Sequence, residues 1–153
     1  MSDSSVDSLV SVVMGSKSDL GLMQAGIDRL AALGIPHEVD IMSAHRSPAR
    51  VADYASKLQT RGVMAIIAGA GAAAHLAGVI AAHTIIPVIG VPIAATKLNG
   101  LDSLLAVVQM PAGVPVGSLG LGRHGATNAA LLAASILALS DETIAAAYNK
   151  FRE

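Results

Sequence analysis

The stretch Val63-Met64-Ala65-Ile66-Ile67-Ala68 is apolar throughout and is followed at once by Gly69-Ala70-Gly71. A short apolar run that ends in small turn residues predicts a strand buried on both faces, as at the centre of a parallel sheet. Residues 9–14 and 87–91 have the same character, whereas apolar and polar side chains alternate over residues 37–42. We therefore expect two further central strands and one edge strand.

Helical periodicity fills the segments between these strands. Apolar residues recur at helical spacing from Leu20 to Ala31, where Ser18 or Asp19 can cap the helix, and Ser47-Pro48 begins the next one. Alternating strands and helices predict an α/β fold with three α/β/α layers, a flavodoxin-like doubly wound parallel sheet. The remaining elements are expected over residues 72–83 (helix), 101–109 (helix), 114–121 (strand) and 140–152 (helix).

Residues 126–139 are almost entirely Ala, Leu and Ile, with polar side chains only at Thr127, Asn128 and Ser135. A helix that is apolar around its whole circumference is buried all round, and one domain of 153 residues has little room for that. We therefore expect a homo-oligomer, with the C-terminal helices over residues 126–153 at the interface between subunits.

Composition limits the class of protein. Apolar residues make up 53% of the chain and charged residues 14%, with a net charge of −1 and no basic cluster, which argues against a nucleic-acid or anionic membrane partner. No cysteine is present, so disulfide and thiolate chemistry are excluded. We expect one domain over residues 1–153.

The first eight residues are polar and acidic, and we expect them to be a flexible N-terminus. They lack the basic and then apolar layout of a signal peptide. No apolar run reaches the roughly 18 to 20 residues that a membrane-spanning helix needs. The expected location is cytoplasmic.

Three turns of unusual composition follow the first three expected strands: residues 15–19, 43–48 and 69–71. The carboxyl ends of parallel strands meet at one edge of the sheet, where open α/β folds bind ligands. In the first turn, the Ser16 hydroxyl could donate to a phosphate and the Asp19 carboxylate could accept from ribose hydroxyls. An ordinary capped helix would also explain this turn, which matches neither the P-loop nor the dinucleotide-binding fingerprint.

His45 and Arg46 carry the strongest chemical signal. A histidine both donates and accepts protons near neutral pH, and the planar guanidinium of Arg46 suits phosphate or carboxylate. A surface loop that merely starts a helix is the alternative. His75, expected one turn into the following helix, either faces the same cleft or is a hydrogen-bonded core histidine. No spacing of His, Asp or Glu resembles a metal site.

Seven distinctive motifs occur in order along residues 15–134. The motifs are Gly-Ser-Lys-Ser-Asp (15–19), Ser-Ala-His-Arg-Ser-Pro (43–48), Gly-Ala-Gly-Ala-Ala-Ala-His-Leu (69–76), Pro-Val-Ile-Gly-Val-Pro (87–92), Asp-Ser-Leu-Leu (102–105), Val-Gln-Met-Pro (108–111) and Asn-Ala-Ala-Leu-Leu-Ala-Ala (128–134). With these motifs the chain resembles the PurE family of 5-(carboxyamino)imidazole ribonucleotide mutases, and the resemblance covers about residues 9–140.

The resemblance implies a homo-octamer of flavodoxin-like subunits in purine (IMP) biosynthesis. It implies an isomerase that needs no metal or organic cofactor and moves a carboxylate from the exocyclic nitrogen to ring carbon 4 of a ribonucleotide. It also implies that His45 is the general acid/base. The implied substrate-binding residues are Ser16, Asp19 and Arg46 for the ribose phosphate, with Ser43, Ala70, Gly71, His75 and Leu76 lining the pocket.

Three positions depart from the family pattern: Ala72 replaces a glycine, Ala77 replaces a proline and His124 replaces a small residue. Three other readings remain open. The related carboxylase branch, which tends to carry lysine after the first histidine, adds free carbon dioxide directly to aminoimidazole ribonucleotide. A non-catalytic nucleotide-binding module or a purely structural oligomer would use the same fold without chemistry.

Overall fold

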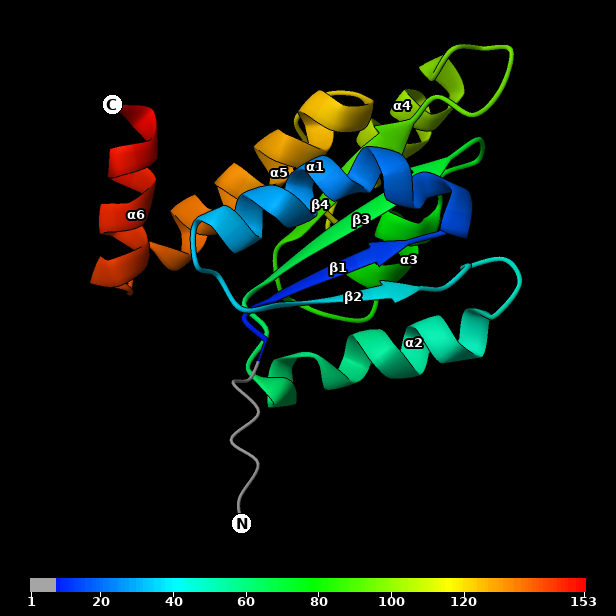
Figure 1. The fold of residues 1–153 in the computed structure, drawn as a ribbon. Helices are drawn as coiled ribbons and strands as arrows, with labels where there is room; N and C mark the ends of the chain where they lie inside the picture. Colours follow the sequence, from blue (N-terminus) through cyan, green and yellow to red (C-terminus); the bar gives the residue numbers. More distant parts are fainter. Residues whose placement is uncertain (1–7) are drawn as a thin grey trace.

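The computed structural model describes residues 8–153. Its five strands form one parallel sheet in the order β2-β1-β3-β4-β5, which is the flavodoxin-like strand order (Figure 1). The predicted fold class is therefore confirmed, and β2 is an edge strand as its alternating pattern predicted. The strands are β1 (Val10–Met14), β2 (His37–Ile41), β3 (Ala65–Gly71), β4 (Val88–Ile93) and β5 (Gly117–Ser118).

Helices cover both faces of the sheet and complete the three layers. Helices α1 and α5 pack against one face, with α6 packed against α5 on the same side, whereas α2, α3 and α4 pack against the other face. The helices are α1 (Leu20–Ala32), α2 (Pro48–Lys57), α3 (Leu76–Ala81), α4 (Leu101–Val108), α5 (Gly122–Leu137) and α6 (Glu142–Arg152), with short 3-10 turns η1 (Lys17–Asp19) and η2 (Gln59–Arg61).

Small side chains let α1 and α5 approach closely. A methyl group added to Gly26 of α1 would lie 2.6 Å from the carbonyl oxygen of Ala126 on α5, so this crossing requires glycine. Ala129, Ala130 and Ala133 of α5 are fully buried in the same core. The abundance of alanine thus corresponds to close packing of helices within the chain.

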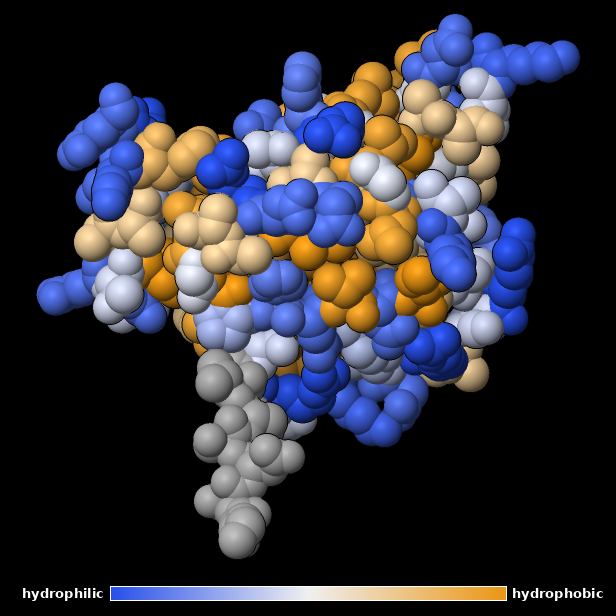
Figure 2. All heavy atoms as spheres, in the orientation of Figure 1, coloured by the Kyte–Doolittle hydropathy of each residue, from blue (hydrophilic) through white to orange (hydrophobic). Residues whose placement is uncertain are grey.

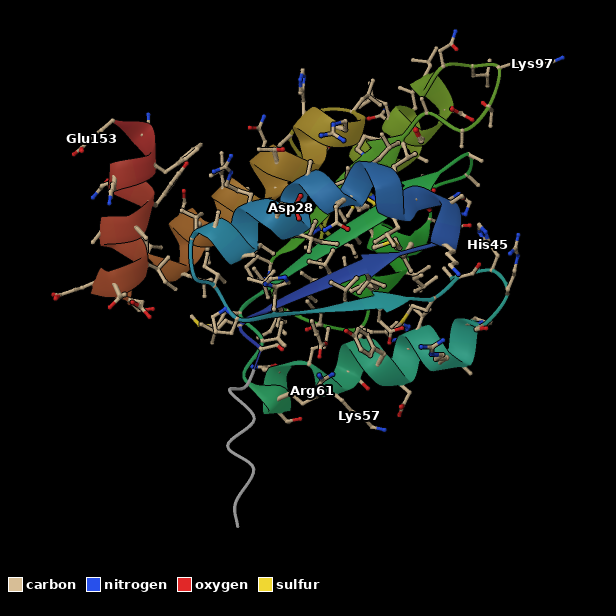
Figure 3. All side chains as sticks on the ribbon, in the orientation of Figure 1. Asp28, His45, Lys57, Arg61, Lys97 and Glu153 are labelled. Atoms are coloured by element: carbon tan, nitrogen blue, oxygen red, sulfur yellow. The ribbon has the colours of Figure 1, made fainter. Side chains whose placement is uncertain are left out.

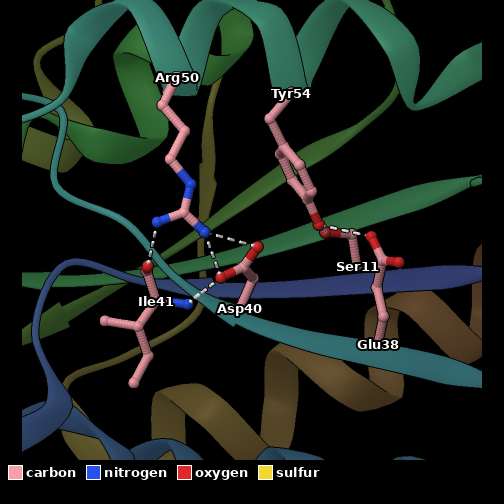
Figure 4. A network of polar contacts seen from close by, with 6 residues as sticks. All are labelled: Ser11, Glu38, Asp40, Ile41, Arg50 and Tyr54. Carbon is pink, nitrogen blue, oxygen red and sulfur yellow. Dashed lines mark hydrogen bonds and ion pairs between the residues drawn. The ribbon is translucent and has the colours of Figure 1, made fainter.

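A polar network joins α2 to the first two strands (Figure 4). The Tyr54 hydroxyl of α2 lies 2.8 Å from the hydroxyl of the fully buried Ser11 and donates to Glu38 on β2. Arg50 donates to Asp40 and to the carbonyl of Ile41, at 2.8 and 3.3 Å. Glu38 and Asp40 of β2 therefore face α2, which explains why polar and apolar side chains alternate over residues 38–41.

Two predicted elements are shorter in the structure. The helix expected over residues 72–83 begins only at Leu76, because Ala72 and Ala74 have φ angles of +52° and +41° that no α-helix accommodates. The strand expected over residues 114–121 pairs with β4 only at Gly117 and Ser118. Pro115 lacks the N–H that a longer ladder would use.

Helix α5 begins four residues earlier than predicted, at Gly122, and is not buried all round within this chain. Its alanine-rich face is buried, whereas Leu132 on the same helix is 36% exposed and Leu139 beyond its end is 88% exposed. The prediction that residues 126–153 form a subunit interface therefore concerns this remaining apolar surface.

The flexible N-terminus predicted for residues 1–8 lies outside the described part of the chain, apart from Ser8. Within residues 8–153, none of the helices combines the length and the apolar character that crossing a membrane would demand.

Candidate active site

A cleft of about 340 Å³ opens at the carboxyl ends of the strands, between the turns that follow β1, β2 and β3. The cleft lies at the topological switch point of the sheet, because β2 and β3 lie on opposite sides of β1. All nine residues singled out from the sequence line the cleft. They are Ser16, Asp19, Ser43, His45, Arg46, Ala70, Gly71, His75 and Leu76.

The turn after β1 is a capping box. The Ser16 side chain accepts the Ser18 N–H at 3.3 Å, and the Asp19 carboxylate accepts the Ser16 N–H at 3.1 Å. Ser16 therefore caps the turn, and the expectation that Ser18 or Asp19 caps the helix by its side chain is wrong. The capping arrangement fixes both side chains at the rim of the cleft, so the structural and functional interpretations are compatible.

Asp19 is the most buried ionisable group of the cleft, with 7% of its surface exposed. Burial raises the pKa of its carboxyl group above the ordinary value of 3.8, and the hydrogen bond from the Ser16 amide lowers it by less. A carboxylate in this position is an acceptor with limited access to water. It is therefore suited to hydroxyl groups of a bound ligand.

His45 and His75 meet across the cleft. Nε2 of His45 lies 2.7 Å from Nδ1 of His75, and the ring planes cross at 82°. Figure 3 shows His45 in the loop between β2 and α2, at the edge where the β1 and β2 arrows end. His75 directly precedes α3 rather than lying one turn inside it, which corrects the prediction for this residue. Both rings are exposed, so the alternative of a core histidine is wrong for His75.

The loop that carries His45 is held by Ser43, whose hydroxyl accepts the Arg46 N–H at 3.2 Å. The exposed Arg46 lines the same cleft as the Ser16 turn. Four residues later, Arg50 is occupied by Asp40 and lies outside the cleft lining. The loop thus presents one imidazole and one guanidinium to the same small volume.

The turn after β3 brings backbone to the cleft. A methyl group added to Gly71 would lie 2.7 Å from Cβ of Ala95 and 3.0 Å from the carbonyl oxygen of Ile93, so only glycine fits there. Ala72 and Ala74 adopt the left-handed region that glycine prefers, which explains why glycine is the usual residue at position 72 in the family pattern. Leu76 closes the floor and is 2% exposed.

Several lining residues were not predicted from the sequence, among them Ala44 and Ala95. Ala95 follows β4, and its position after a fourth parallel strand was the available signal. Ala44 carries no chemical signal of its own. Among the side chains of residues 8–153, no three of His, Cys, Asp or Glu gather as a metal site would require.

Comparison of the whole sequence with known proteins shows the family of this chain. The profile of the AIR carboxylase family matches residues 9–153, which is nearly the whole chain. The chain belongs to the AIR carboxylase family.

Other members of the AIR carboxylase family are closely similar. N5-carboxyaminoimidazole ribonucleotide mutase of Brucella melitensis is 53% identical over 144 residues, which cover 94% of this chain and 89% of the relative. The mutase of the same name from Pseudomonas aeruginosa is 52% identical over 147 residues, covering 96% and 90%. The resemblance on which the sequence analysis relied is thereby confirmed.

A solved structure shows the same fold in this family. The crystal structure of Treponema denticola PurE superposes with a TM-score of 0.84 at 28% sequence identity, covering 94% of this chain and 88% of that one. The overall fold described above is therefore shared with a solved PurE structure.

Proposed function

We propose that this chain is an N5-carboxyaminoimidazole ribonucleotide mutase of purine biosynthesis. The observation that carries the proposal is the pairing of His45 with His75 in a cleft whose rim holds Arg46 and the Ser16 turn. A proton carrier and an anion-binding group within one cleft match a small phosphorylated substrate whose carboxylate must move. Relatives about half identical in sequence bear the name of this mutase.

The ribose phosphate binds at the Arg46 end. The guanidinium of Arg46 and the Ser16 hydroxyl are donors, which a phosphate dianion accepts. Asp19 is the buried acceptor and takes hydrogen bonds from ribose hydroxyls. Ser43, Ala70, Gly71, His75 and Leu76 then surround the imidazole of the substrate.

His45 performs the first proton transfer. Its imidazolium donates a proton to the exocyclic nitrogen as the bond from that nitrogen to the carboxylate carbon breaks. The electron pair of that bond stays on nitrogen, and the products are carbon dioxide, aminoimidazole ribonucleotide and neutral His45. A positioned acid of this kind contributes a factor of about 10² to 10⁴ to the rate.

The second step reverses the roles. Ring carbon 4 of aminoimidazole ribonucleotide attacks the retained carbon dioxide, and a new carbon–carbon bond forms. Neutral His45 removes the proton from that carbon, which restores the aromatic ring and regenerates the imidazolium. No electrons are gained or lost overall, so the reaction balances with one titrating side chain and without a cofactor.

Retention of carbon dioxide requires a closed site, and both histidines are exposed in the single chain. We therefore include a homo-oligomer, most simply an octamer, in the proposal. Apolar surface is left over for such contacts: Ile85 is 86% exposed at the mouth of a groove of about 500 Å³ that Leu132 and Ile136 also line. Figure 2 shows further apolar patches on the face that carries α1 and β2.

Sedimentation tests the assembly separately. We expect one species larger than the 15.3 kDa monomer at low micromolar concentration. A stable monomer would contradict the interface role of residues 126–153. The single domain predicted from the sequence is the unit that assembles, and the cytoplasm is the proposed location because phosphorylated ribonucleotides are retained inside cells.

The second candidate activity is direct carboxylation of aminoimidazole ribonucleotide, favoured by the description of the family as AIR carboxylase. Purified protein should be assayed with N5-carboxyaminoimidazole ribonucleotide and, separately, with aminoimidazole ribonucleotide plus bicarbonate. The mutase proposal predicts fast formation of the 4-carboxylate only from the first substrate. Turnover restricted to the second substrate would establish the carboxylase instead, and binding without any turnover would establish the non-catalytic module.

A further inference from the structure

The loop of residues 94–100, between β4 and α4, forms one side of the cleft although sequence motifs did not point to it. Ala95 is a lining residue, and the Cβ position of Gly71 is within 2.7 Å of the Ala95 methyl group. At the other end of the loop, Gly100 packs against Leu121, with φ of +89°. The loop therefore lies against the body of the protein at both ends.

Two side chains of α4 hold this loop. The Ser103 hydroxyl is fully buried and donates to the carbonyl oxygens of Ile93 and Gly100, at 2.9 and 3.0 Å. The Thr96 hydroxyl donates to Oδ2 of Asp102 at 2.7 Å and accepts the Leu98 N–H at 3.1 Å. Ser103 thus fixes the ends of the loop, and Asp102 fixes its middle.

The second carboxylate oxygen of Asp102, Oδ1, is buried and has no hydrogen-bond partner. Burial of a carboxylate costs free energy, and the hydrogen bond from Thr96 to Oδ2 offsets part of that cost. The contact the carboxylate makes is with Thr96, next to the cleft-lining Ala95. This hydrogen bond therefore ties the loop of residues 94–100 to the partly buried carboxylate on α4.

We propose that Thr96 and Asp102 are positioning residues for substrate binding: their hydrogen bond holds the loop of residues 94–100 against Gly71, so that Ala95 keeps the cleft narrow. The inference rests on the proposed mutase function, because the ligand whose fit it controls is the ribonucleotide. Neither residue touches the reacting atoms. Their effect is on affinity rather than on the chemical step.

The test compares Thr96→Val, which keeps the side-chain shape and removes the hydroxyl, with Thr96→Ser, which keeps the hydroxyl. We expect Thr96→Val to raise KM about three- to ten-fold, the effect of one net hydrogen bond, with kcat within about two-fold. Thr96→Ser should restore the KM of the unmodified protein. Thr60→Val is the matched control, since Thr60 donates to the Lys57 carbonyl outside the cleft at 2.8 Å.

A second measurement needs no turnover. Lys97 lies at the tip of the loop and points away from the body of the molecule (Figure 3), so trypsin can report on how firmly the loop is held. We expect cleavage after Lys97 to be faster in Thr96→Val than in Thr96→Ser, with cleavage after the exposed Lys57 as internal reference. Aminoimidazole ribonucleotide should slow cleavage after Lys97 in the unmodified protein.

The outcomes separate the two proposals. If the unmodified protein converts the mutase substrate but Thr96→Val keeps its KM, the role of the loop is refuted while the function stands. Equal cleavage rates after Lys97 in the two Thr96 variants would likewise refute it. If the unmodified protein fails to convert the substrate, the function is refuted, and the cleavage rates still decide whether Thr96 and Asp102 hold the loop.

Discussion

Nε2 of His45 and Nδ1 of His75 lie 2.7 Å apart, although their residues come from turns after different strands. One of the two nitrogens donates and the other accepts, so each ring constrains the tautomer of the other. His75 thereby orients the ring of His45 at the cleft, and His75 itself occupies the residue position directly before α3. In the proposed mechanism, His45 is the reacting group and His75 is the group that supports it.

His45→Asn should abolish most turnover while leaving ligand binding nearly intact. Asparagine keeps a polar side chain of similar reach but cannot transfer a proton near neutral pH, so kcat should fall about 10²- to 10⁴-fold. The measurement is steady-state kinetics together with calorimetric binding of aminoimidazole ribonucleotide. His83→Asn is the control, because His83 is exposed and lies outside the cleft lining. Near-normal turnover of His45→Asn would refute the assigned role.

His75→Phe should be much milder than His45→Asn. Loss of the hydrogen bond frees the His45 ring to rotate, and we expect kcat to fall about ten-fold or less, by loss of orientation rather than of the proton carrier. In the double variant, His75→Phe should add little to the effect of His45→Asn. Additive effects in the two variants would show that His75 acts independently of His45.

Arg46→Met should weaken substrate binding with a smaller effect on the chemical step. Removing a charged hydrogen-bond donor to phosphate should raise KM about 10- to 100-fold. Arg50→Met is a matched control, because Arg50 of α2 pairs with Asp40 of β2 at the surface and lies outside the cleft lining. If both variants raise KM alike, the effect belongs to overall charge and not to the Arg46 site.

The buried carboxyl group of Asp19 should make the free energy of unfolding depend on pH. Because burial raises the pKa of this carboxyl on folding, the ionised form opposes folding, and this penalty disappears as the pH falls through the raised pKa towards 3.8. The free energy of unfolding of the unmodified protein, relative to Asp19→Asn, should therefore increase on acidification from neutral pH. Urea unfolding at several pH values measures this difference, and a decrease on acidification would contradict the assignment.

Tyr54→Phe should destabilise the fold without affecting the cleft. The fully buried Ser11 hydroxyl would lose its partner, at a cost of about 1–3 kcal/mol, and Glu38 would lose a donor. Thermal unfolding should show a Tm lower by about 3–10 °C. Adding Ser11→Ala should recover part of the loss, and Tyr148→Phe, on α6, should change Tm little. An unchanged Tm in Tyr54→Phe would show that the network contributes nothing.

The sequence predicted the fold from local patterns. It predicted the nine lining residues from the turns after the strands together with the family resemblance, which alone pointed to Ser43 and Leu76. Continuous apolar runs are typical of central strands, and the edge position of β2 followed from its alternation. Polar turn residues after parallel strands must converge at one edge. These inferences required no knowledge of which distant side chains meet.

The remaining features depend on contacts that patterns do not encode. The late start of α3 follows from positive φ angles at Ala72 and Ala74, and alanine gives no sign of such a conformation. The helix-like composition of residues 72–75 therefore led to a helix that is too long and placed His75 inside it. The hydrogen bond from Thr96 in the loop to Asp102 on α4 joins positions six apart in the sequence, and periodicity does not reveal it.

The strained alanines after β3 have a consequence for ligand binding. A left-handed φ costs an alanine roughly 1–2 kcal/mol, and Ala72 and Ala74 both adopt one beside the cleft. This cost is part of the free energy of folding, so the backbone that precedes His75 already has its final conformation before a ligand binds. A substrate that arrives there loses little additional free energy to ordering the protein, and glycines at these two positions would shift that entropy loss from folding to binding.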